Sequence, residues 1–222
     1  MSKLSFVERL RVLRVLRVWP ISAEDDVSTV STDNVLRALR EQRLTTLALA
    51  DQIKDDRWRE PVLPGERSLH DLLSHILAWD EWAVGVFEIS RLRSLPPVLI
   101  EALRDVDAYN ARAVRRYANI TRDDILSALQ ASPDRVLASA IGPGGESWQE
   151  RRFPELAHAG AIAAGKDESV VTSRGPSVGG LLRLLLRHEM SHQQEISEGF
   201  GIEPHLERFR EDGDEGEGAS GG

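Results

Sequence analysis

Apolar residues in this 222-residue chain recur at intervals of three and four, which leaves little choice of secondary structure. Residues three or four apart share one face of an α-helix, so each such run predicts a helix with one buried side. The clearest run follows Ser68, a residue type that caps helix N-termini well. Its apolar positions are Leu69, Leu72, Leu73, Ile76, Trp79, Ala83, Val86 and Phe87. Leu, Ala, Arg and Glu are also plentiful, which favours helices over strands.

Other segments carry similar patterns, and proline or glycine separates most of them. One further helix is predicted to begin near Asp33. Three more are predicted at about 98–117, 121–140 and 177–198. Pro133 falls inside one of them and can kink it. Gly199 and Gly201 follow the last helix and are expected to stop it. Long helices of this kind, with one longer loop at 142–174, predict an all-α helical bundle.

The chain is expected to divide into three regions: 1–32 as an N-terminal extension and linker, 33–206 as the helical domain, and 207–222 as a disordered, acidic, glycine-rich tail. Residues 1–19 are basic, and arginines interrupt their apolar residues, which argues against an export signal. A short helix without function fits residues 1–19. So does an amphipathic segment that lies on a membrane or binds a partner.

Composition removes several classes of function. The formal net charge is −8, so the chain lacks the electrostatic drive for non-specific nucleic-acid binding. It has no cysteine, which rules out disulfides, thiolate metal sites and a cysteine nucleophile, and suits the cytoplasm. No apolar run is long enough to span a bilayer, so no membrane partner is expected. A homodimer through exposed helix faces stays open.

Three of the six histidines are predicted to face the inside of the bundle. His188 and His192 are one helical turn apart on the side that carries Leu181 and Leu185, and His75 flanks the apolar face of its own helix. Three neutral imidazoles from two helices can bind one divalent ion and leave positions open for water or substrate. Zn, Ni, Fe and Mn all accept such ligands, and histidines satisfied within a core are the alternative. His70 is expected to face water.

Several other residues are candidates around these histidines. Glu195 lies on the inward face one turn beyond His192. It could be a fourth ligand, an acceptor for an imidazole N–H, a general base, or a carboxylate that reaches solvent. Asp80 and Trp79 could support the site or line a pocket, although Trp79 also suits the core, and Glu189 is not expected to be a ligand. The loop 142–174 could cover the site and hold an anion, or be a surface loop whose arginines are solvated. Its candidate residues are Trp148, Arg151, Arg152 and Arg174.

Three stretches of the sequence resemble the DinB/YfiT-like metal-binding superfamily over about residues 33–200. They are LRALREQRLTTLALADQIKDDRW, PGERSLHDLLSHILAWDEW and HEMSHQQEI. The resemblance implies a four-helix bundle in which His75, His188 and His192 bind a divalent metal, most often nickel or zinc, with iron and manganese as alternatives. Members of the superfamily frequently have Gln at the position of Glu195, so the role of this carboxylate does not carry over.

A further stretch, DVDAYNARAVRRYANITRDDILSAL, resembles maleylpyruvate isomerase-like and colibactin-resistance-like branches. Some relatives are thiol-dependent transferases or isomerases. The resemblance therefore implies a metal-dependent enzyme that acts on a small molecule, with a low-molecular-weight thiol as partner and Glu195 as a candidate catalytic base. A non-catalytic stress-response or ligand-binding bundle with a structural metal is the alternative. An interaction module that uses residues 1–19 is the third reading.

Overall fold

The computed structural model describes residues 32–89, 96–141, 148, 150–156 and 175–203, and these residues are almost entirely helical. The elements are α2 (Thr32–Asp51), the 3-10 turn η1 (Asp55–Arg57), α3 (Leu69–Ile89), α4 (Pro97–Arg104), α5 (Val106–Arg116), α6 (Arg122–Ile141) and α8 (Val178–Phe200). The described ranges contain no β-strand, only two isolated bridges. The all-α prediction is confirmed. The predicted extension before residue 32 and the tail after 206 lie outside the described residues.

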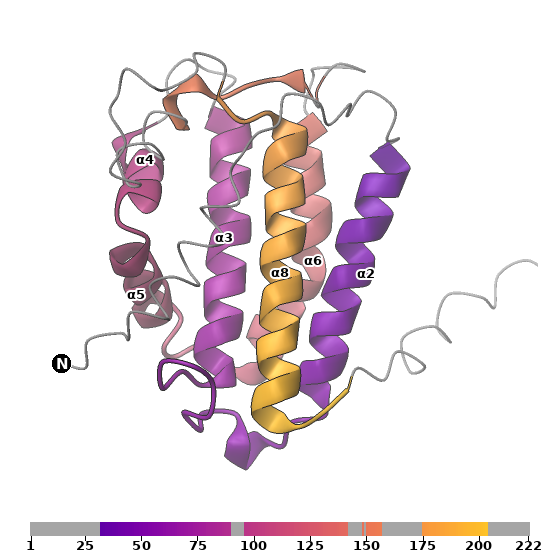
Figure 1. Cartoon of the computed structure of the whole chain (residues 1–222), viewed down its shortest axis with the longest axis vertical. Coiled ribbons are helices and arrows are strands. Elements are labelled where there is room, and N and C mark those ends of the chain that lie inside the picture. The colour runs from indigo at the N-terminus through magenta and orange to yellow at the C-terminus, as the bar shows by residue number, and fades with distance from the viewer. Residues whose placement is uncertain (1–31, 90–95, 142–147, 149, 157–174, 204–222) are drawn as a thin grey trace, which may run out of the picture.

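Four long helices form the bundle (Figure 1). Helix α3 packs against α6 and α8, and α2 packs against the same two helices from the other side. The order around the bundle is therefore α2, α6, α3, α8. Helices α4 and α5 lie outside this ring, against the outer side of α3. None of the described helices combines the length and the apolar character that a membrane crossing requires.

The prediction of one helix over 98–117 is wrong, because the chain breaks at Asp105 into α4 and α5. Asp105 has an extended backbone, with φ −138° and ψ 79°, and its side chain accepts a hydrogen bond from the backbone N–H of Ala108 at 2.9 Å. It is thus the N-cap of α5. The apolar spacing continues through this position without a proline or glycine, so the pattern gave no sign of the break.

The predicted start of α3 after Ser68 and the predicted stop of α8 at Gly201 are confirmed, but the predicted stop at Gly199 is wrong. Ser68 and Asp71 exchange two hydrogen bonds, each side chain accepting from the backbone N–H of the other at 3.1 Å, which begins α3. Helix α8 ends at Gly201, whose positive φ of 65° suits glycine. Gly199 lies inside the last turn instead of stopping the helix. A Cβ there would come within 2.6 Å of the Leu63 side chain, so glycine lets the loop before α3 approach α8.

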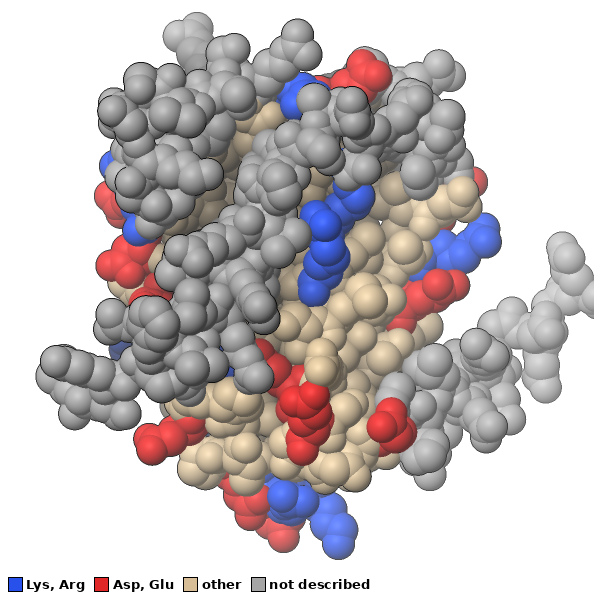
Figure 2. All heavy atoms as spheres, in the orientation of Figure 1, with Lys and Arg blue, Asp and Glu red and all other residues tan. Residues whose placement is uncertain are grey.

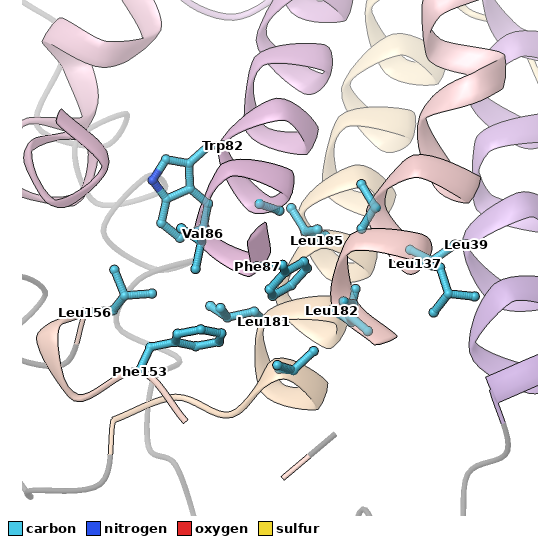
Figure 3. Packing of buried hydrophobic residues seen from close by; sticks show 14 of the residues in the cluster. Leu39, Trp82, Val86, Phe87, Leu137, Phe153, Leu156, Leu181, Leu182 and Leu185 are labelled. Atoms are coloured by element: carbon cyan, nitrogen blue, oxygen red, sulfur yellow. The ribbon is translucent and has the colours of Figure 1, made fainter. Parts of the chain in front are cut away.

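The upper core cluster, defined by Phe87, Leu181 and their neighbours, fills one end of the bundle (Figure 3). Trp148 and Phe153 are buried in it, so the described part of the loop 142–174 caps the bundle and is not a solvated surface loop. Arg151 donates to the backbone carbonyls of Phe87 and Ala140, near the C-terminal ends of α3 and α6. Arg174 lies outside the described residues.

Phe87 is fully buried at the centre of the upper core cluster. We expect Phe87→Ala to lower the free energy of unfolding by about 3–5 kcal/mol, because it removes buried apolar surface and leaves a cavity. The exposed Met190, which lies on α8, provides the control, and Met190→Ala should change stability by less than ~0.5 kcal/mol. Denaturant titration followed by circular dichroism measures both variants, and equal effects would contradict this description of the core.

Candidate metal centre

The structure brings His75, His188 and His192 together at one point between α3 and α8. The Nε2 atom of His188 lies 2.8 Å from Nε2 of His75 and 2.9 Å from Nε2 of His192. All three candidate ligand atoms lie within 4.8 Å of one another. Nitrogens bound to one metal at about 2.0–2.1 Å are roughly 3 Å apart, so this cluster has the spacing of a ligand set. The histidine group could hold one metal ion.

Burial favours the neutral form of the His75 and His188 rings. Desolvation, followed by the neighbouring histidines and Arg67, lowers the pKa of His75 well below its usual value. Desolvation, the charge on His192 and then the two arginines Arg67 and Arg43 lower the pKa of His188 in the same way. A neutral imidazole has one ring nitrogen with a free lone pair, and that is the form that binds a metal.

The second ring nitrogen of His192 faces a hydrogen-bond acceptor. Its Nδ1 lies 3.3 Å from Oε2 of Glu195. The carboxylate can only accept while it is ionised, so it holds the proton on Nδ1 of His192 and leaves the Nε2 lone pair pointing into the cluster. Nε2 atoms 2.8 and 2.9 Å apart either share a proton in an N–H···N hydrogen bond or hold a cation between them. The donor set therefore fits a divalent ion.

Arg67 secures the Glu195 carboxylate. Its Nη2 donates to Oε2 of Glu195 at 2.6 Å, and its Nε donates to the carbonyl of Pro64 at 3.0 Å. Burial acts to raise the pKa of Glu195, but the hydrogen bond to His192 and the charge of Arg67 together lower it below its ordinary value. Arg67 follows a tight turn in which Gly65 and Glu66 both have positive φ, at 77° and 58°. This turn carries the guanidinium to α8.

Two of the three histidines open onto a cavity of about 780 Å³ between α3, α5 and α8. His75 and His188 line it, together with Trp79, Asn110 and Glu195. Figure 2 shows acidic side chains gathered over the C-terminal half of α8 and basic ones nearer its N-terminal half. Cavities of this volume hold small molecules in other proteins. The geometry thus joins a candidate metal centre to a binding pocket.

Comparison with known families agrees with this architecture. The family model of the DinB superfamily matches residues 38–196, a span that includes all three histidines and reaches from within α2 to within α8. The chain belongs to the DinB superfamily. No curated protein and no solved structure matches it. Membership of the DinB superfamily supports the four-helix bundle and a metal-binding role. It does not indicate a particular reaction.

The prediction that His70 faces water is wrong. His70 is buried, with only 1 % of its surface exposed, because the loop after α2 wraps around the first turn of α3. The backbone N–H of His70 donates to the carbonyl of Trp58 in that loop at 3.2 Å. Burial, together with the charge of Arg59, lowers the pKa of His70. Counting around a single helix cannot show that a preceding loop covers its outer face.

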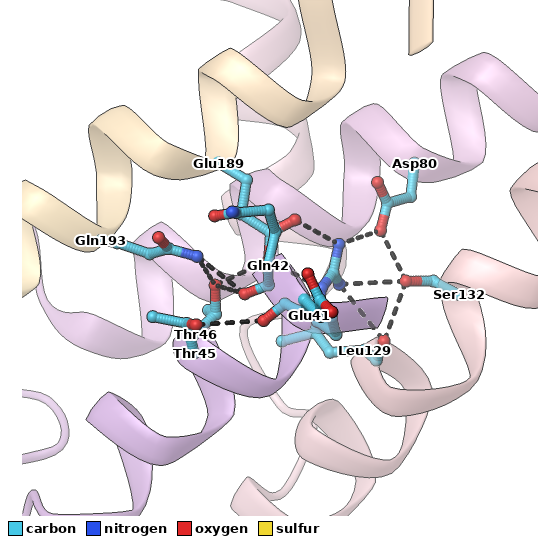
Figure 4. Close-up of polar contacts among 10 residues, drawn as sticks. Glu41, Gln42, Thr45, Thr46, Asp80, Leu129, Ser132, Glu189 and Gln193 are labelled. Atoms are coloured by element: carbon cyan, nitrogen blue, oxygen red, sulfur yellow. Dashed lines mark hydrogen bonds and ion pairs between the residues drawn. The ribbon is translucent and has the colours of Figure 1, made fainter. Parts of the chain in front are cut away.

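Asp80 and Glu189 belong to a buried network around Arg43 on α2, away from the cavity (Figure 4). The Arg43 guanidinium donates to Asp80 at 2.7 Å, to Glu189 at 2.8 Å and to the hydroxyl of Ser132 at 3.0 Å. These partners lie on α3, α8 and α6. Desolvation opposes the charge, but the two carboxylates raise the pKa of Arg43 above its ordinary value. Asp80 therefore supports the bundle. The prediction that it could line the pocket is wrong.

Removal of Arg43 should be strongly destabilising. Arg43→Ala leaves two carboxylates buried without their cation, and we expect the free energy of unfolding to fall by about 3–5 kcal/mol. Arg40 lies on the same helix and pairs with Asp134 at 2.9 Å, but both side chains are more than half exposed. Arg40→Ala should therefore cost ~1 kcal/mol or less. Thermal and urea unfolding of the two variants measure the difference, and a similar loss in both would refute the central role of Arg43.

Proposed function

We propose that His75, His188 and His192 hold one divalent metal ion, and that the chain is a metal-dependent enzyme acting on a small molecule. The convergence of three Nε2 atoms beside an open cavity carries this proposal. Zinc and nickel are the metals that we favour, and iron and manganese are the alternatives. The resemblance to thiol-dependent transferases and isomerases suggests thiol transfer or removal of a small electrophile as the reaction class.

When bound, a divalent metal would supply Lewis acidity that favours the anionic form of a thiol or water at neutral pH. The chain's own contribution is to bind and orient. Trp79 and Asn110 form a wall of the cavity beside His75, and their side chains are joined by a hydrogen bond of 3.1 Å. Helix α5, which carries Asn110, faces α8 across the cavity and limits the access of water to the histidines.

The contacts of Glu195 favour one of its predicted roles. Its Oε2 is engaged by both Arg67 and His192, so we assign it to orienting the His192 ring. A general base needs an oxygen that is free to take a proton from substrate, and the strong hydrogen bond from Arg67 opposes this. Glu195 as a catalytic base remains a prediction.

The first test is metal content. Tag-free protein should contain about one metal ion per chain by elemental analysis, because the three histidines form one site. His188→Ala should lose the ion, since it removes the central imidazole. Met190→Ala, two residues along α8 and exposed, is the matched control and should retain it. Absence of metal from the parent protein even after reconstitution with zinc or nickel would overturn the proposal.

A structural metal is the second candidate function, and the burial of His75 and His192 favours it. In both cases, chelation should lower the melting temperature, because metal that binds only the folded state stabilises it. The coordination shell separates the two cases. With cobalt(II) in the site, an added small thiol should change the visible absorption spectrum if a coordination position is open to the cavity. A spectrum that excess thiol leaves unaltered indicates a closed, structural site.

The orienting role of Glu195 makes its own prediction. Glu195→Ala should weaken metal binding by about 10- to 100-fold, the range typical for groups that hydrogen-bond to metal-binding histidines. Glu195→Gln keeps an oxygen that can accept from His192 and should change the affinity much less. Glu198 lines the same cavity but is not part of the His192–Arg67 interaction, so Glu198→Ala is the control. Competition titration with a chromophoric chelator gives the affinities, and equal affinity in all three variants would count against this role.

A further inference from the structure

The cavity has two chemically different ends, with the histidines between them. Along α3, the polar Asp71 precedes His75, and Trp79 and Trp82 follow it. Along α8 the order is reversed, with Leu181, Leu184 and Leu185 before His188, and Glu195 and Glu198 after it. The two helices therefore place their apolar residues at the same end. We call this end the apolar chamber, formed by Trp79, Trp82, Leu103, Leu181, Leu184 and Leu185.

The polar atoms of the chamber walls already have partners. The indole N–H of Trp79 donates to Oδ1 of Asn110 at 3.1 Å, and that of Trp82 donates to the carbonyl of Leu99 at 2.9 Å. The two indole rings lie 5.3 Å apart at 67°, in an edge-to-face arrangement. The six residues that define the chamber include no charged side chain. Trp79 and Leu184 are half-buried and present carbon surface to the cavity, while the other four are buried behind them in the upper core cluster.

The length of the chamber follows from the helix geometry. Trp82 lies seven residues beyond His75 and Leu181 seven residues before His188. At about 1.5 Å of rise per residue, the chamber extends roughly 10 Å from the histidines. One aromatic ring with a short branch fits this length, and the edge-to-face indoles suit an aromatic ring as a neighbour.

We infer that the apolar chamber binds an uncharged aromatic or branched apolar group of the substrate, whose reacting atom lies at the histidines. This inference rests on the proposed function, because the histidines define where the reacting atom lies. An ionised group in the chamber would lose its hydration without gaining a partner, so the chamber selects against charge. The polar end, where Arg67, Arg115 and Glu198 reach the cavity, is left for the hydrophilic part of a ligand.

Two matched thiols test the inference by calorimetric titration of the zinc-loaded full chain. Phenylmethanethiol can place its ring in the chamber with its sulfur at the histidines, whereas 4-(mercaptomethyl)benzoate would carry an ionised carboxylate into the same space. We expect the carboxylate to weaken binding at least about tenfold. Equal or tighter binding of the carboxylated thiol to the unmodified protein would overturn the inference, whatever the variants show.

A charge introduced into the chamber should reverse this preference. Leu184 is half-buried on α8 and lines the chamber, so Leu184→Arg should weaken phenylmethanethiol and strengthen the carboxylated thiol. Met190→Arg makes the same substitution at an exposed site of the same helix and should leave both affinities unchanged. Circular dichroism establishes that both variants are folded. A folded Leu184→Arg variant with the original preference would contradict the chamber.

Metal-free protein separates this inference from the proposed function. Phenylmethanol and 4-(hydroxymethyl)benzoate repeat the comparison without a thiol, and saturation-transfer NMR detects their weaker binding. A preference for phenylmethanol supports the chamber even if the protein binds neither metal nor thiol. Failure to bind metal or thiol would then contradict only the proposed function. Equal saturation transfer to both alcohols would overturn the chamber even if the zinc-loaded protein binds thiols.

Discussion

One buried guanidinium joins all four helices of the bundle. Arg43 of α2 reaches Asp80 on α3, Ser132 on α6 and Glu189 on α8, and the hydroxyl of Ser132 donates in turn to Asp80 at 2.6 Å. Such a network has a demanding geometry, since each carboxylate is costly to bury without its partner. It also fixes the rotation of α8. Successive helical residues point about 100° apart, so holding Glu189 against Arg43 directs the adjacent His188 away from α2 and toward α3.

The candidate metal centre depends on elements outside the four-helix ring as well. His75 would meet solvent on the outer side of α3 if α5 did not pack there, and α5 also brings Asn110 to Trp79. The loop before α3 closes the opposite side. Gly199 lets Leu63 approach α8, and the turn at Gly65 and Glu66 then directs Arg67 to Glu195. The orientation of His192 therefore depends on a loop more than a hundred residues away in sequence.

Periodicity alone predicted the bundle and the inward face of the three histidines, because helical geometry decides both. It could not reveal the break at Asp105, which needs no proline or glycine, nor the burial of His70, which a loop covers. The Arg43 network was also missed, although the sequence holds a signal for it. Arg43 falls four residues after Leu39 and four before Leu47, inside the apolar stripe of its helix. A charged residue in such a stripe needs a buried partner, and Glu189 beside His188 supplies one.

The two faces of α8 carry different groups, the Arg43 network on one and the candidate metal ligands on the other. Glu189 is bound to Arg43 through both carboxylate oxygens and also accepts a hydrogen bond from Thr46 at 2.6 Å, so its carboxylate is engaged on the side of α2. The neighbouring face carries His188, His192 and Glu195, and Arg67 and Trp79 pack around this group. Because Arg43, Asp80 and Glu189 are not among the candidate metal ligands, their network holds α8 in place without any contribution from the histidines.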